Sequence, residues 1–158
     1  VDVSPAMLRV ARDKARAGAR LAAAEDPALP VLGADTCILL DGRMLGKPGD
    51  ADEALDMLAR LSGRGHMVLS GVAVAWDGRV ADALSRSAVH FRPLSEAERR
   101  AYVAHGEPLD KAGAYAIQGL GAMFVTHLEG SYSGVMGLPL FETARLLLEP
   151  GIHPLGPD

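Results

Sequence analysis

The stretch Val31-Leu32-Gly33-Ala34-Asp35-Thr36-Cys37-Ile38-Leu39-Leu40, followed at once by Asp41-Gly42, decides the fold. Its apolar and β-branched residues favour a buried strand, and Asp-Gly is a strong signal for a two-residue hairpin turn. We therefore predict a strand over residues 31–40 that turns back into a second strand at Arg43-Met44-Leu45.

The rest of the chain alternates predicted strands with predicted helices. A second Asp-Gly pair, Asp77-Gly78, joins two long strand-like segments over residues 67–76 and 80–91. Helical patterns cover Pro5 to Ala24, a segment that Asp50 caps and Gly63 ends, a short segment from Ser95 to Gly106, and a last segment after Pro139. The predicted fold class is α/β, with a mixed twisted sheet flanked by helices.

Composition narrows the function. The chain has 158 residues, which fits one domain, and its formal net charge is −4. Its longest basic run is Arg99-Arg100, which argues against a nucleic-acid partner, and no apolar run reaches membrane-spanning length. The only cysteine, Cys37, permits no intrachain disulfide, and Asp2 stands where a signal peptide would be basic. These features predict a cytoplasmic protein.

Asp35 interrupts an otherwise apolar strand. A buried carboxylate needs a partner or a metal ion, because its desolvation is costly. The small residues Gly33 and Ala34 would let a ligand approach the backbone there. The alternative is a bulge or a strand end at which Asp35 faces water, and the stretch alone does not decide between the two interpretations.

Two lysines and a glutamine are further candidates for ligand binding. Lys47 stands between Gly46 and Pro48, so its backbone is held, and lysine is a compact phosphate-binding charge. Lys111 could meet a phosphate, and Gln118 offers a donor and an acceptor that suit the edge of a base. The alternatives are solvated turn residues, and for the nearby Tyr115 we favour a place in the core.

Other chemistries lack their motifs. The segment Gly130-Ser131-Tyr132-Ser133-Gly134 has tyrosine where the serine-hydrolase turn requires serine. The five histidines show no metal-ligand spacing, and neither a P-loop nor a dinucleotide fingerprint is present. Binding of phosphates would therefore rest on separate side chains.

Taken together, the motifs resemble those of the Maf family. The resemblance runs over roughly residues 5–148, with several motifs in the same order. It is carried by Gly33-Ala34-Asp35-Thr36 with Gly46-Lys47-Pro48, by Leu61-Ser62-Gly63-Arg64, by Pro108 to Tyr115 with Ile117-Gln118-Gly119, by Gly130-Ser131-Tyr132 with Gly137-Leu138-Pro139-Leu140, and by the helix that contains Lys14.

This resemblance implies a fold of the Maf and inosine triphosphatase-like kind, with two lobes, a central cleft and often a homodimer. It implies hydrolysis of a nucleoside triphosphate to the monophosphate and pyrophosphate with a divalent cation, Mg²⁺ or Mn²⁺. The segment from Asp110 to Gly119 is similar to the branch of the family that acts on dTTP and UTP, rather than the one that acts on 7-methyl-GTP.

The resemblance also assigns roles to residues. Asp35 matches the proposed catalytic base, and it is equally a candidate metal ligand. Thr36 and Gln118 match positions linked to substrate choice. The positions that match charges near the phosphates are Lys14, Lys47 and Lys111.

Two other functions stay open at this point. One is a housecleaning pyrophosphatase that prefers modified nucleotides, and the other is a nucleotide-binding regulator of cell division with little or no turnover. Asp35 separates binding from catalysis, because a pure binder has no use for a carboxylate that repels phosphates.

The chain is expected to form a single Maf-like domain over residues 1–158 that lacks one part of the family pattern. The family carries an N-terminal loop with a serine and two arginines that grips the triphosphate, and this sequence runs from Val1-Asp2-Val3 straight into Ser4-Pro5. We expect the whole protein to contain a further N-terminal segment.

Overall fold

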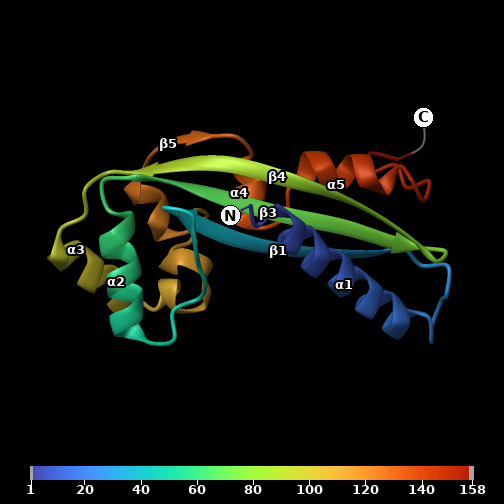
Figure 1. Ribbon diagram of the computed structural model, residues 1–158, viewed down its shortest axis with the longest axis horizontal. Coiled ribbons are helices and arrows are strands. Elements are labelled where there is room, and N and C mark those ends of the chain that lie inside the picture. The colour runs from blue at the N-terminus through green and yellow to red at the C-terminus, as the bar shows by residue number, and fades with distance from the viewer. Residues whose placement is uncertain (1, 157–158) are drawn as a thin grey trace.

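A computed structural model describes residues 2–156 and contains a five-stranded sheet flanked by helices (Figure 1). This confirms the predicted α/β class; of the opening Val1-Asp2-Val3, Val1 lies outside the described residues. The strands stand in the order β2-β1-β3-β4-β5. Their bounds are β1 (Val31–Leu40), β2 (Arg43–Leu45), β3 (Gly65–Trp76), β4 (Arg79–Phe91) and β5 (Val125–Glu129).

The prediction of a mixed sheet is wrong, because all four strand pairs within residues 2–156 are antiparallel. The Asp41-Gly42 and Asp77-Gly78 turns form as predicted, with positive φ at all four residues. Helix α2 (Ala51–Leu61) then carries the chain from β2 to the far side of β1. Strand β3 enters there antiparallel to β1. Strands β2 and β3 therefore run in the same direction, but β1 lies between them.

The helices gather at two ends of the long strands (Figure 1). Toward one end lie α2 and α3 (Glu96–Ala104), and toward the other lie α1 (Ser4–Ala22) and α5 (Leu140–Leu147). Short segments complete the chain: η1 (Glu107–Asp110), η2 (Ala112–Ala114), η3 (Leu120–Phe124) and α4 (Tyr132–Met136). None of the helices within residues 2–156 is long and apolar enough to cross a membrane.

The core is divided in the same way. The largest cluster joins α2 and α3 to the sheet through residues such as Leu58, Ile38 and Val68. On the opposite face of the sheet, Met7 of α1 packs with Cys37 and Leu69. One continuous sheet therefore links two helical ends.

Two strand glycines let α1 approach the sheet closely. A Cβ atom on Gly33 would lie 2.4 Å from the backbone nitrogen of Ala15, and one on Gly71 would lie 3.1 Å from the carbonyl oxygen of Met7. Ala11 and Ala15 are completely buried at this contact. The close approach sets Lys14, one residue before Ala15, beside the edge of β1.

A buried histidine makes the stability of the fold depend on pH. His66 of β3 is 4% exposed, and its Nε2 lies 2.7 Å from the Tyr115 hydroxyl. Burial, followed by repulsion from His90, lowers the pKa of His66 to about 4. The folded protein therefore resists protonation that the unfolded chain accepts below pH ~6.5.

We expect acid to weaken the fold through this residue. The stability that neutral His66 contributes is complete above pH ~6.5 and is lost as pH falls toward 4, by about 2–3 kcal/mol at pH ~4.5. Urea unfolding above pH ~6.5 and at pH ~4.5 measures the loss in the free energy of unfolding. The exposed His105→Gln variant should keep the whole loss, and His66→Gln should reduce it; equal losses in both variants would contradict the assignment.

Candidate active site

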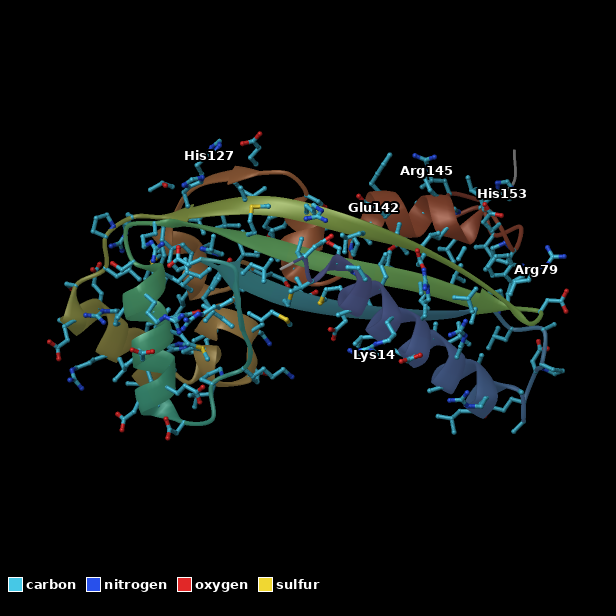
Figure 2. All side chains as sticks on the ribbon, in the orientation of Figure 1. Lys14, Arg79, His127, Glu142, Arg145 and His153 are labelled. Atoms are coloured by element: carbon cyan, nitrogen blue, oxygen red, sulfur yellow. The ribbon has the colours of Figure 1, made fainter. Side chains whose placement is uncertain are left out.

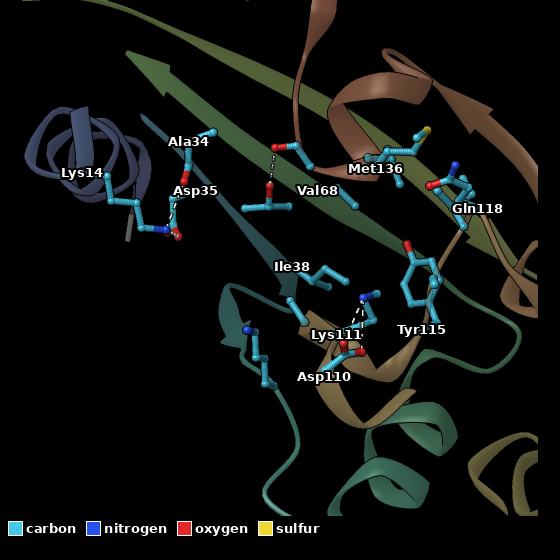
Figure 3. A pocket seen from close by; sticks show the side chains of 17 residues that line it. Lys14, Ala34, Asp35, Ile38, Val68, Asp110, Lys111, Tyr115, Gln118 and Met136 are labelled. Atoms are coloured by element: carbon cyan, nitrogen blue, oxygen red, sulfur yellow. Dashed lines mark hydrogen bonds and ion pairs between the residues drawn. The ribbon is translucent and has the colours of Figure 1, made fainter. Parts of the chain in front are cut away.

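A cleft opens along the part of β1 that has no second strand partner. Strand β2 pairs only with residues 38–40, which leaves the edge of β1 from Val31 to Cys37 uncovered. The cavity there has a volume of about 310 Å³. All six side chains predicted from the sequence line it, namely Lys14, Asp35, Thr36, Lys47, Lys111 and Gln118 (Figure 3).

Asp35 points into this cleft from an unbroken strand. The pairing of β1 with β3 runs from Val31 to Leu39 without a register shift, so the alternative of a bulge or a strand end is wrong. Lys14 lies 2.6 Å from Oδ1 of Asp35 and also donates to the carbonyl oxygen of Ala34 at 3.0 Å (Figure 3). The Asp35 side chain is 30% exposed and that of Lys14 is 51% exposed, so both can reach a ligand.

Lys47 and Lys111 come from two loops that are joined to each other. The Gly113 N–H donates to the Gly46 carbonyl oxygen at 3.0 Å, which ties the segment after β2 to η2. Lys111 lies 3.2 Å from the Asp110 carboxylate, whereas Lys47 has no ion-pair partner among residues 2–156. Three lysines and two aspartates thus surround the cavity, which leaves a net positive charge for an anionic ligand.

Gln118 lies at the opposite end of the cleft from Asp35 (Figure 3). Its side chain is exposed and makes no hydrogen bond within the described residues. The neighbouring Tyr115 is 5% exposed and contacts His66, which confirms its predicted place in the core, although it also borders the cavity. An elongated ligand could therefore meet charged groups at one end and an amide at the other.

The turn that carries Gln118 is fixed by a residue that the sequence did not reveal. The Glu107 carboxylate accepts hydrogen bonds from the Tyr102 hydroxyl and from the N–H groups of Leu120 and Gly121. Burial alone would raise the pKa of Glu107, but these three hydrogen bonds outweigh it and lower the pKa. No local motif marks Glu107, because its partners come from two separate segments, Tyr102 from α3 and Leu120 and Gly121 from η3.

Other residues of the cleft were also missed. Asp110 lines it beside Lys111, and Met136 and Gly137 approach it from α4. Ser70, on β3, lies behind Thr36 at an Oγ–Oγ distance of 2.8 Å. A serine in an apolar strand carries no signal of its own, since its role depends on pairing with β1.

The carboxylates of the cleft suit a metal ion that binds together with a phosphate-bearing ligand, rather than one that the protein coordinates alone. No cluster of three or more His, Cys, Asp or Glu side chains exists within residues 2–156. The cleft does offer the separate carboxylates of Asp35 and Asp110. Mg²⁺ is commonly bound by one or two carboxylates together with substrate phosphates and water, and these residues fit that pattern.

Comparison with known proteins agrees with the geometry. A dTTP/UTP pyrophosphatase of Bordetella avium is 53% identical over 147 residues, which cover 92% of this chain and 73% of the relative. The dTTP/UTP pyrophosphatase of Alkalilimnicola ehrlichii is 58% identical over 94% of this chain and 75% of the relative. That of Nitrosomonas europaea is 52% identical over 94% of this chain and 73% of the relative. A family model described as Maf-like protein matches residues 2–149. The chain therefore belongs to the Maf family.

Proposed function

We propose that this protein hydrolyses dTTP and UTP to the monophosphate and pyrophosphate. The observation that carries the proposal is the convergence of three lysines, the Asp35 carboxylate that Lys14 holds, and the amide of Gln118 around one cavity. The relatives named dTTP/UTP pyrophosphatase support the choice of substrate. Membership of the Maf family supports the reaction class.

The lysines bind and orient the triphosphate. Lys14, Lys47 and Lys111 neutralise charge on the phosphates, which is most of what phosphoryl-type substitution requires of a protein. Lys14 already holds Asp35, so the same ammonium group can bridge the carboxylate and a phosphate oxygen. This bridge would place Asp35 next to the α-phosphorus.

Asp35 acts on the attacking water. The water forms a bond to the α-phosphorus, the bond from that phosphorus to the bridging oxygen breaks, and pyrophosphate leaves. The Asp35 carboxylate orients the water and accepts its proton. It is held for this task by the middle of β1 and by Lys14.

A divalent cation, Mg²⁺ or Mn²⁺, is part of the proposal. Asp35 is the residue that would hold it, with phosphate oxygens completing its coordination. The ion would supply charge neutralisation at the phosphates.

The direct test is a panel of nucleotides incubated with Mg²⁺ or Mn²⁺ and assayed for pyrophosphate. We expect dTTP and UTP to give the largest kcat/KM values, above those of CTP, dATP and 7-methyl-GTP. Preference for 7-methyl-GTP would overturn the substrate assignment. Binding of nucleotides without any release of pyrophosphate would favour a regulatory protein instead.

Gln118 should affect the choice of base. Its free amide can pair with the edge of a pyrimidine, and loss of one such hydrogen bond costs roughly 1 kcal/mol, or about a fivefold effect. We expect Gln118→Ala to lower kcat/KM for dTTP and UTP by about that factor or more. Inhibition by inorganic tripolyphosphate, which has no base, should be unchanged; an equal effect on both would show that Gln118 acts on the phosphates.

We further propose a cytoplasmic homodimer. The exposed apolar side chains of α5 and the turn after it form a surface that a second copy can cover, and Phe141 of this surface is 67% exposed. The single cysteine, Cys37, is buried and unpaired, as suits a reducing compartment. Light scattering of the purified protein at the mass of a monomer would contradict the dimer.

A further inference from the structure

A chain of hydroxyl groups lies between the sheet and α4, behind the cleft. Ser70 of β3 is 1% exposed, and its Oγ donates to the Gly134 carbonyl oxygen at 2.5 Å. The same Oγ lies 2.8 Å from Oγ1 of Thr36, the neighbour of Asp35 on β1. Thr36 and Gly137 border the cleft. So does Met136, the last residue of α4 (Figure 3).

Counting protons fixes the direction of these hydrogen bonds. A serine hydroxyl has one proton, and Ser70 uses it on the Gly134 carbonyl oxygen, which can only accept. The 2.8 Å contact is therefore satisfied only if the Thr36 hydroxyl donates to Ser70. The other inward neighbour of Thr36, the Gly137 carbonyl oxygen at 3.4 Å, is an acceptor that competes for the same proton. Thr36 has no proton left for the cleft.

We propose that Ser70 is a positioning residue that makes Thr36 a fixed hydrogen-bond acceptor, through which the site selects an N–H or O–H donor on the nucleoside. A phosphate oxygen is itself an acceptor and gains nothing from such a hydroxyl. A donor that pairs with it is favoured, and a substrate without that donor leaves a partly buried oxygen unpaired. The inference rests on the proposed pyrophosphatase function.

The proposed substrates share two donors that Thr36 could read. Thymine and uracil both carry an N3–H group, and ribose and deoxyribose both carry a 3′-hydroxyl. Cytosine has no hydrogen at N3. The ligand chemistry is therefore a nucleoside N–H or O–H, and N3-methyl-dTTP and 3′-deoxy-dTTP each lack one of them.

The experiment measures kcat and KM for dTTP and for both analogues in four proteins. These are the unmutated protein, Thr36→Val, Ser70→Ala and Ser87→Ala. Ser87 is a matched control, because it is equally buried beneath the start of α4 and accepts from the Ser131 N–H at 2.9 Å without touching Thr36. Circular dichroism and thermal melting verify that each variant is folded.

We expect the unmutated protein to prefer dTTP over one analogue by about tenfold or more in kcat/KM. The analogue that is disfavoured identifies the donor as the base or the sugar. Thr36→Val removes the acceptor and Ser70→Ala frees its orientation, so each should reduce this preference at least about threefold, mainly through KM. Ser87→Ala should retain the preference.

Three results would overturn the inference. The first is an unchanged preference in Thr36→Val. The second is an effect of Ser70→Ala, in folded protein, that is no larger than that of Ser87→Ala. The third is an equal fall in kcat for every substrate, which would place the attacking water at Thr36. Failure of the proposed function looks different, because the unmutated protein would then release no pyrophosphate from dTTP.

Discussion

Replacing Asp35 with asparagine should lower kcat for dTTP by about 100-fold or more while leaving the fold intact. The amide keeps the shape of the side chain but cannot accept a proton, and general-base catalysis typically contributes 10²–10⁴-fold. Asp35 is the carboxylate that Lys14 holds at the open edge of β1. KM should change less than kcat, because the lysines that we propose bind the phosphates remain.

Asp41→Asn is the matched control for this substitution. Asp41 is also ion-paired, with Arg64, but it sits in the hairpin turn outside the cleft. Its φ of 51° is one that asparagine adopts readily. Near-normal turnover in a well-folded Asp35→Asn protein, or an equal loss in Asp41→Asn, would remove Asp35 from the mechanism.

The second large effect is expected from Gly33→Ala. The added Cβ would lie 2.4 Å from the Ala15 nitrogen and 2.5 Å from the Ala11 carbonyl oxygen, and helix backbone cannot yield as a flexible side chain does. Overpacking of this kind costs about 3 kcal/mol, which urea unfolding would detect. Because α1 must move away, Lys14 would also leave Asp35, and kcat/KM for dTTP should fall.

Gly46→Ala provides the comparison for stability. A Cβ on Gly46 would meet no atom within 4 Å, and its backbone conformation is open to other residues. We expect its free energy of unfolding to stay within ~0.5 kcal/mol of the unmutated value. A similarly small change in Gly33→Ala would mean that α1 does not rest on β1 as closely as described.

Local signals in the sequence predicted much of the fold. Both Asp-Gly turns and the Asp50 cap of α2 form as expected, because each depends on residues that are neighbours in the chain. The prediction of a mixed sheet was wrong, because the direction of β3 relative to β1 depends on how α2 crosses the sheet. The path of α2 is set by tertiary packing, and the periodicity of apolar residues in the sequence does not predict it.

The site divides along the same line. Asp35 stood out because a charge in an apolar strand is costly, and Gln118 because its amide suits the edge of a base. The resemblance to the Maf family supplied Lys14 and Thr36. Glu107 and Ser70 were missed because both act through partners distant in sequence. A charged residue in an apolar strand, such as Asp35, can be recognised from the sequence. Residues that position the site, such as Glu107 and Ser70, can be recognised only from the structure.

The central claim is that water attacks the α-phosphorus. It is tested most directly by hydrolysing dTTP in ¹⁸O-labelled water and measuring the ¹⁸O content of each product by mass spectrometry. The proposed mechanism predicts one ¹⁸O atom in dTMP and none in pyrophosphate. Label in the pyrophosphate would place the attack on the β-phosphorus, and labelled inorganic phosphate with dTDP would place it on the γ-phosphorus; either result would contradict the mechanism.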